Sequence, residues 1–354
     1  MTDSRPTIAL SLGSGGARGY AHIGVLEEIE ARGWEVVGVA GSSMGALVGG
    51  LWAAGGLGAY REWVESMSRR DVLWMMDPAF KGAGAMRADK IMRRISDILG
   101  DTRIEDLPIP YTAVATDLLS QSEVWFTSGS LVDAIRASIA IPTVITPVQR
   151  DGRLLADGGI LNPVPVIPLA SVRADATVGV NLAGTFVGGN AAKPPVNADS
   201  GPLARLPRLR LPTVHIAEPR LLGMIGDRFW PRGDGGQGGG SQGEGAQDDT
   251  ERAVAPADEP ASMPGPPGAS SPEAGDGATQ PFDVTTLDVF DRALQTIQNS
   301  LQRYRLAGYP PDVMIEIPSD SCGTLDFHRA TEMIGVGREE ARAAFDAWGG
   351  PPRR

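Results

Sequence analysis

Short apolar runs alternate with amphipathic segments along most of the chain. Runs rich in Val, Ile, Leu and Ala predict strands, and segments with apolar residues on one face predict helices. The predicted strands span residues 6–12, 34–41, 109–119, 122–129, 174–184 and 312–318. The predicted helices span residues 19–33, 43–54, 86–100, 130–138, 283–308 and 338–348. This alternation predicts an α/β fold with three α/β/α layers, in which helices cover both faces of a mostly parallel central sheet.

One stretch, between Glu35 and Arg61, contains no charged residue. Its length matches that of a helix that spans a membrane. However, eight of residues 38–60 are glycine, and glycine inside a helix costs about 1 kcal/mol relative to alanine. We therefore interpret the stretch as a buried strand, a tight turn and a helix of small residues.

The net charge of −11 is concentrated in one segment. Residues 233–280 hold nine acidic residues and one arginine, so they carry −8 and leave −3 for the remaining chain. Rich in glycine and proline and without aromatic residues, this segment is predicted to be a disordered acidic insert. Residues 1–232 would form the main domain, and the helices and strand of residues 281–348 would complete it. The nearly neutral remainder has no basic footprint, so we expect no nucleic-acid partner.

Residues 41–45 read Gly-Ser-Ser-Met-Gly, a G-x-S-x-G pattern between a predicted strand and a predicted helix. In such a turn the central serine takes a strained backbone conformation, and flanking glycines avoid steric clashes. Ser43 is therefore the candidate nucleophile at the carboxyl edge of the sheet. Ser42 is an alternative hydroxyl, one position from the centre of the pattern.

A serine that transfers acyl groups needs a general base and donors for an oxyanion. The chain has three histidines, His22, His215 and His328. None lies in a motif that marks a base, and a lone histidine is more often structural. Asp157 is the better candidate, because it ends a short predicted strand and precedes two glycines, although Asp-Gly is also an ordinary turn.

The segment from Gly13 to Gly19 holds four glycines between a predicted strand and a predicted helix. Backbone N–H groups of such a loop form an anion site at the helix N-terminus. The loop does not match a dinucleotide fingerprint, because Arg18 stands where glycine is required, and it lacks the Gly-Lys-Ser/Thr of a Walker loop. We expect neither a cofactor nor a metal. Arg18 adds a fixed positive charge that suits an oxyanion or an anionic head group.

The chain resembles the patatin-like phospholipases, particularly their bacterial serine esterases and lysophospholipases. Four motifs occur in the order and spacing of that family: GSGGARGYAHIGVLEEI, GSSMGALVGGLWAAG, ASIAIP and ADGGILNPVPV. The resemblance covers about residues 7–185, the core motifs of a patatin-like catalytic domain, and again residues 283–340. Ser14 is a departure, because many relatives have glycine at this position.

The resemblance implies a Ser-Asp catalytic dyad without histidine, in which Ser43 is the nucleophile and Asp157 is the base. It also implies an oxyanion hole formed by Gly15, Gly16 and Arg18. The glycines that belong to the motifs are Gly13, Gly41, Gly45, Gly158 and Gly159.

The implied function is that of a serine acyl hydrolase, which cleaves carboxylic ester bonds of phospholipids or lysophospholipids through an acyl-enzyme on Ser43. Two alternatives stay open. One is a non-catalytic scaffold or regulatory protein that keeps the fold, and the other is acyl transfer to an acceptor other than water.

Two features of the sequence bear on the location of the protein in the cell, namely the N-terminus and one basic segment. The N-terminus does not read as a signal peptide, so we expect a cytoplasmic protein. Residues 203–232 carry six arginines against two acidic residues, interleaved with large apolar side chains. This mixture fits peripheral contact with the inner face of a membrane, although an ordinary surface segment explains it more simply. The oligomeric state stays open.

Overall fold

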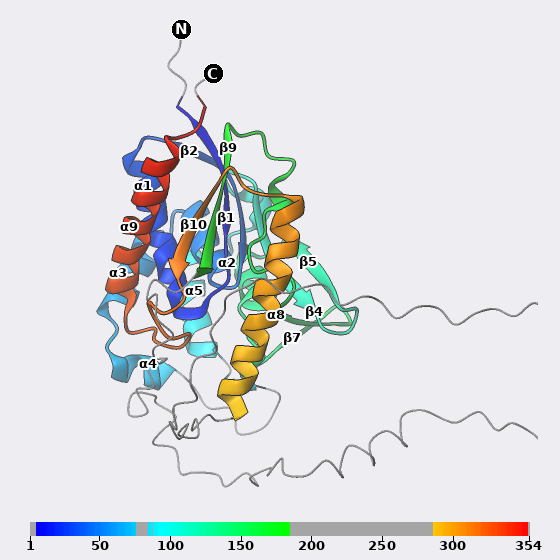
Figure 1. The fold of residues 1–354 in the computed structure, drawn as a ribbon. Helices are drawn as coiled ribbons and strands as arrows, with labels where there is room; N and C mark the ends of the chain where they lie inside the picture. Colours follow the sequence, from blue (N-terminus) through cyan, green and yellow to red (C-terminus); the bar gives the residue numbers. More distant parts are fainter. Residues whose placement is uncertain (1–4, 76–83, 87, 185–285, 353–354) are drawn as a thin grey trace, which may run out of the picture. The chain divides into compact units, whose positions relative to one another are not determined.

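The structure is a computed structural model that describes residues 5–75, 84–86, 88–184 and 286–352 (Figure 1). The predicted acidic insert, residues 233–280, lies outside the described residues. The basic segment 203–232, with His215, lies outside them as well. The proposed domain division therefore stays a prediction.

The described part of the chain is built on a mixed sheet of eight strands with the order β10-β9-β1-β2-β4-β8-β7, and β5 pairs with β4 off this path. The strands are β1 (Thr7–Leu12), β2 (Glu35–Ser42), β4 (Tyr111–Asp117), β5 (Ser122–Phe126), β7 (Val148–Arg150), β8 (Arg153–Asp157), β9 (Ala176–Gly184) and β10 (Val313–Pro318). Neighbours from β10 to β4 are parallel, whereas β5, β7 and β8 pair antiparallel. Two short strands, β3 (Gly84–Met86) and β6 (Thr143–Ile145), form a separate parallel pair.

Helices flank this sheet, and in Figure 1 α1, α3 and α9 lie on one side of it and α8 on the other. The helices are α1 (Ala21–Ala31), α2 (Met44–Ala53), α3 (Leu57–Ser66), α4 (Arg69–Met75), α5 (Asp89–Leu99), α6 (Leu131–Ser138), α8 (Thr286–Gly308) and α9 (Ala330–Trp348). Short 3-10 turns span Gly16–Tyr20, Ile104–Asp106, Gly158–Ile160 and Ile167–Leu169. The predicted α/β class, with helices around a mostly parallel sheet, is confirmed.

The uncharged stretch forms β2, a turn, α2 and the beginning of α3. Its strand and first helix are almost entirely buried, and they pack in the main hydrophobic core with β1 and α1. Among the described residues, no helix has both the length and the apolar character needed to cross a membrane.

Three parts of the fold differ from the sequence prediction. Helix α9 begins at Ala330, eight residues before the predicted start at Arg338. Helices α3 and α4 were not predicted, and neither was the antiparallel hairpin of β7 and β8. The hairpin matters for the site, because β8 ends at Asp157.

Candidate active site

Ser43 occupies a strained turn between β2 and α2. Its backbone angles are φ 54° and ψ −121°, and a positive φ is costly for a residue with a side chain. The flanking glycines make the turn sterically possible. A Cβ on Gly41 would lie 2.4 Å from the nitrogen of Ala46, and one on Gly45 would lie 2.0 Å from the carbonyl oxygen of Leu12.

Helix α6 stabilises the turn through hydrogen bonds of its last residue, Ser138. The backbone N–H of Ser43 donates to Ser138 Oγ at 2.9 Å, and the Ser138 hydroxyl donates to the carbonyl of Val114 at 2.6 Å. Ser138 belongs to the ASIAIP motif, so sequence reasoning found the motif but missed this contact. The Ser43 side chain thereby stays at the N-terminus of α2, where the helix dipole favours negative charge.

Sheet register brings Asp157 beside Ser43. Ser42 pairs with Val114 on β4, and the next residue of that strand, Ala115, pairs with Asp157 on β8. The two candidate residues therefore emerge on either side of β4 at the same edge of the sheet. The carbonyl of Asp157 also accepts from Thr116 Oγ1 at 2.9 Å, which fixes the end of β8.

Asp157 is 3% exposed. Burial raises its pKa to about 6, and this effect outweighs the Ser43 hydroxyl, the Gly159 N–H and the Ser14 hydroxyl, which lower the pKa. Asp157 Oδ1 accepts from the Gly159 N–H at 2.8 Å and from Ser14 Oγ at 3.5 Å. Ser14, the departure from the family pattern, thus lies within reach of the carboxylate.

The two candidate side chains each contain a buried atom without a hydrogen-bond partner. Neither Ser43 Oγ nor Asp157 Oδ2 has a hydrogen bond of normal geometry among the described residues. The hydroxyl nevertheless lies close enough to lower the pKa of the carboxyl group. A buried hydroxyl close to a buried carboxyl group is the arrangement that proton transfer between a nucleophile and a base requires.

Ser42, the alternative hydroxyl, has a different role in this geometry. Its Oγ is buried and donates to the backbone carbonyl of Asn162 at 2.6 Å. The N–H of Asn162 in turn donates to the carbonyl of Gly158 at 2.9 Å. Ser42 therefore ties the Ser43 turn to the turn after Asp157.

The glycine-rich loop lies between β1 and the 3-10 turn that leads into α1. Ser14 N–H donates to the carbonyl of Pro163, and Ala17 N–H donates to that of Thr324. Gly15 and Gly16 lie between these two anchors and line the same pocket as Asp157. Their N–H groups are the candidate oxyanion donors.

The side chains of Arg18 and His22 hold this loop in place through hydrogen bonds to its backbone carbonyls. The buried Arg18 guanidinium donates to the carbonyls of Gly15 and Ser319. His22 is entirely buried, and its Nε2 lies 2.8 Å from the carbonyl oxygen of Gly13. Burial lowers the pKa of His22 to about 4, so the ring is neutral and Nε2 carries the hydrogen. The motif containing His22 was evident in the sequence, but this contact was not.

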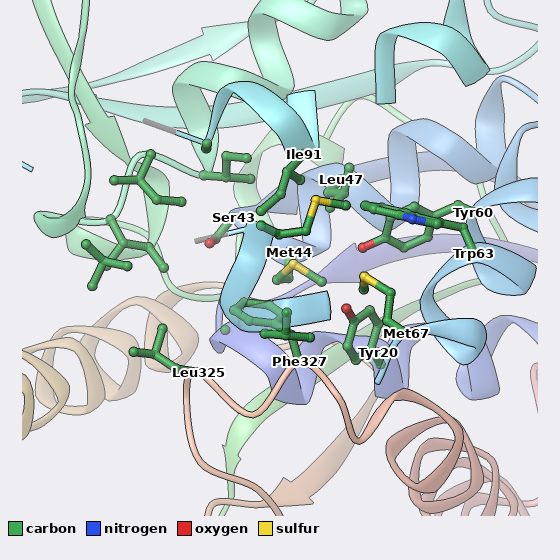
Figure 2. A pocket seen from close by; sticks show the side chains of 18 residues that line it. Tyr20, Ser43, Met44, Leu47, Tyr60, Trp63, Met67, Ile91, Leu325 and Phe327 are labelled. Carbon is green, nitrogen blue, oxygen red and sulfur yellow. The ribbon is translucent and has the colours of Figure 1, made fainter. Parts of the chain in front are cut away.

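Ser43 also borders an apolar cavity, shown in Figure 2. Figure 2 shows Tyr60 and Trp63 of α3 at the end of the cavity that is farther from Ser43. Most of its remaining lining is aliphatic or sulfur-containing, including Met44, Leu47, Met67, Ile91 and Ile139. A cavity of this character suits a hydrocarbon chain.

Comparisons with known proteins bear on the family of the chain. The family model described as patatin-like phospholipase matches residues 10–170. A protein of Mycobacterium tuberculosis named as an uncharacterized NTE family protein is 46% identical over 346 residues, which cover 98% of this chain and 93% of that protein. Neuropathy target esterase sws of Drosophila melanogaster is 37% identical over 166 residues, which cover 45% of this chain and 12% of that protein.

The crystal structure of VipD from Legionella pneumophila aligns with 55% of this chain and 52% of that chain at 18% identity, and its TM-score of 0.32 is too low to bear on the fold. The family model and the nearly full-length mycobacterial relative are decisive. The chain belongs to the patatin-like phospholipase family, among the NTE family proteins.

Proposed function

We propose that this protein is a serine acyl hydrolase that cleaves carboxylic ester bonds of lipids, phospholipids and lysophospholipids among them. Membership of a family of lipid esterases supports the general activity. The observation that carries the residue assignment is that Ser43 Oγ and Asp157 Oδ2 are both buried without another partner, while the Ser43 hydroxyl lies close enough to lower the pKa of the Asp157 carboxyl group. The helix N-terminus and the apolar cavity beside them supply a site for negative charge and a site for an acyl chain.

The first half of the reaction forms an acyl-enzyme. The Asp157 carboxylate accepts the proton of Ser43 as Oγ attacks the ester carbonyl carbon. The N–H groups of Gly15 and Gly16 stabilise the oxygen that becomes negative. When the tetrahedral intermediate collapses, the C–O bond to the alcohol breaks, and the alcohol leaves with the proton from Asp157.

The second half returns the enzyme to its starting state. Water attacks the acyl carbon of the Ser43 ester and gives its proton to Asp157. Collapse of this second intermediate releases the fatty acid, and Ser43 Oγ regains its proton from Asp157. An acceptor alcohol in place of water would give acyl transfer by the same steps.

A raised pKa makes Asp157 a better base than a free carboxylate. A solvated aspartate, with a pKa near 3.9, accepts a serine proton poorly. At a pKa of about 6, the group is still ionised at pH 7 but holds a proton more firmly. Ser43 thus needs no histidine as its base. The neutral ring of His22 instead donates a hydrogen bond from Nε2 to the carbonyl of Gly13.

The test is hydrolysis of p-nitrophenyl octanoate by the full-length chain and three variants. We expect Ser43→Ala and Asp157→Asn each to lower kcat by at least about a thousandfold, as removal of triad groups does in other serine hydrolases. Ser42→Ala is the matched comparison, because it removes a neighbouring hydroxyl that holds Asn162. We expect it to lower kcat by less than about tenfold, the cost of one hydrogen bond.

The alternatives give different results. A wild-type protein that hydrolyses no acyl ester would favour the non-catalytic scaffold. Full activity in Ser43→Ala together with its loss in Ser42→Ala would move the nucleophile to Ser42. Circular dichroism of each variant distinguishes loss of a reacting group from loss of the fold.

A further inference from the structure

Helix α8 presents an unusual face to the candidate site. A helix on the surface of a protein normally turns an apolar stripe inward. Here Gln295, Gln298, Asn299 and Gln302 recur at helical spacing and line a pocket shared with Asp157, Gly15 and Gly16. Large apolar side chains lie on the outer face, where Ile297 is 61% exposed and Tyr304 is 79% exposed. Together with Leu294, this amide-rich face of α8 therefore borders the site.

The amide face is held in place relative to the reactive residues. Arg305, near the end of α8, forms an ion pair with Glu123 of β5. The other carboxylate oxygen of Glu123 accepts from Asn162 Nδ2 at 3.0 Å. Asn162 is the residue whose carbonyl binds Ser42, so one chain of contacts joins α8 to the Ser43 turn. Such anchoring suits a specificity surface, which has to keep its position during turnover.

The positions of the two cavities indicate which half of an ester each of them would bind. The apolar cavity and the α8 pocket meet at Gly16 and Ile141, which line both. An acyl chain in the apolar cavity leaves the alcohol half of the ester on the α8 side of Ser43. Amide groups both donate and accept hydrogen bonds, which matches hydroxyl groups.

The charged groups that the described residues place around this pocket do not suit a phosphate. Among the described residues that line it, Arg18 and Asp157 are the charged ones. Arg18 already donates to the carbonyls of Gly15 and Ser319. The carboxylate of Asp157 repels an anion at neutral pH, and phosphate recognition ordinarily relies on available Arg or Lys.

We propose that Gln298, Asn299 and Gln302 of α8 bind the alcohol half of the substrate and select an uncharged, hydroxyl-bearing group, such as glyceryl, over one that carries a phosphate. This inference rests on the proposed function and ranks the lipid esters within it. Gln302 is 7% exposed, and a buried amide gains most from a polar partner.

The test compares two soluble esters with the same acyl chain, 1-octanoylglycerol and 1-octanoylglycerol 3-phosphate. Each enzyme is also measured on p-nitrophenyl octanoate, whose alcohol has no aliphatic hydroxyl groups. For the wild type we expect kcat/KM for the glyceryl ester to exceed that for the phosphate-bearing ester by at least about tenfold. In Gln298→Leu and Asn299→Leu, the ratio of kcat/KM for the glyceryl ester to that for p-nitrophenyl octanoate should fall by about tenfold for each lost hydrogen bond.

The control variants are Thr296→Ala and Ser300→Ala, which remove exposed hydroxyls from the other face of α8. They should keep the wild-type ratio. Because each ratio is taken within one protein, partial loss of folded enzyme cancels. Equal or faster cleavage of the phosphate-bearing ester, or a ratio unchanged in the α8 variants, would overturn the inference while p-nitrophenyl octanoate hydrolysis still supports the esterase. A wild type inactive on every ester would overturn both.

A second measurement uses glycerol as an acceptor, because the site of the leaving alcohol is also the site of an attacking one. A glycerol hydroxyl attacks the acyl carbon on Ser43, its proton passes through Asp157 to Ser43 Oγ, and 1-octanoylglycerol forms. We expect glycerol to divert more octanoyl groups from water than equimolar glycerol 3-phosphate does. Equal or greater diversion by glycerol 3-phosphate would contradict the assignment of α8.

Discussion

As the proposed base, Asp157 would have to be ionised to accept a proton, yet it lies in a buried position that favours its neutral form. Burial raises its pKa to about 6, and the neighbouring donors only partly reverse this effect. The pKa of a solvated aspartate is about 3.9, so in this protein the carboxyl group gains or loses its proton near the middle of the accessible pH range. Activity should therefore report its protonation state.

We expect kcat/KM for p-nitrophenyl octanoate to rise with pH and to level off above an apparent pKa of about 6. Below that value the protonated carboxyl group cannot accept the serine proton, so kcat/KM should fall about tenfold per pH unit. Initial rates between pH 4.5 and 8 give the profile.

The control is His328→Gln, which removes a histidine that does not line the candidate site and should keep the same profile. His22 does not interfere, because its pKa is lowered to about 4 and its ring stays neutral across most of the range. A profile that is flat between pH 5 and 7, or one that changes in His328→Gln, would contradict Asp157 as the base.

The sequence was enough to predict the candidate residues of the site, but it was not enough to predict the residues that hold them in place. Ser43 and Asp157 stand in local motifs, so short-range spacing marks them. Ser138, the last residue of α6, accepts a hydrogen bond from the N–H of Ser43, and Ser14, in the loop after β1, lies close to Asp157. Such contacts depend on which strands are neighbours, and no local pattern contains that information.

Where α1 and α9 cross, each helix has a glycine that lies against the backbone of the other helix. A Cβ on Gly24 of α1 would lie 2.0 Å from the carbonyl oxygen of Ile334. A Cβ on Gly337 of α9 would lie 2.0 Å from the carbonyl oxygen of Ala21. The two backbones therefore touch directly, and neither partner is a flexible side chain that can move away.

We expect Gly337→Ala to lower the free energy of unfolding by about 3 kcal/mol, because overpacking here forces two backbones apart. Gly335→Ala is the matched control, since its Cβ meets nothing within 4 Å and the residue is exposed on the same helix. It should raise the free energy of unfolding by about 0.5–1 kcal/mol through the helix propensity of alanine. Urea denaturation of both variants measures the difference, and equal effects of the two substitutions would exclude direct backbone contact.

These glycines also explain why the sequence prediction placed the start of α9 too late. Gly335 and Gly337 disfavour a helix locally, so the predicted helix began at Arg338. Packing against α1 overrides that preference, and the helix begins at Ala330. The main parallel strands were easier to predict, because they are buried on both faces and read as continuous apolar runs.

The apolar cavity is a property of the whole described fold, because distant segments line it. Tyr20 follows the glycine-rich loop, Tyr60 and Trp63 belong to α3, and Phe327 precedes α9. The rings of Tyr20 and Phe327 meet edge to face with centroids 6.1 Å apart. No sequence pattern relates these positions, so the cavity could not be predicted, whereas Ser43 stands in a local motif that marks it as a candidate.

Trp63 should limit the length of acyl chain that the cavity accepts, because it lies at the end of the cavity that is farther from Ser43 (Figure 2). Each buried methylene contributes about 0.8 kcal/mol, so kcat/KM for p-nitrophenyl esters should rise up to about fourfold per carbon until the chain reaches Trp63. Trp63→Ala removes that barrier, and the optimum should move to longer chains. Trp125→Ala is the control, since Trp125 is exposed on β5 and does not line the cavity. Steady-state kinetics with a butanoyl to hexadecanoyl series measures the optimum, and the same optimum in Trp63→Ala and wild type would show that the acyl chain does not reach Trp63.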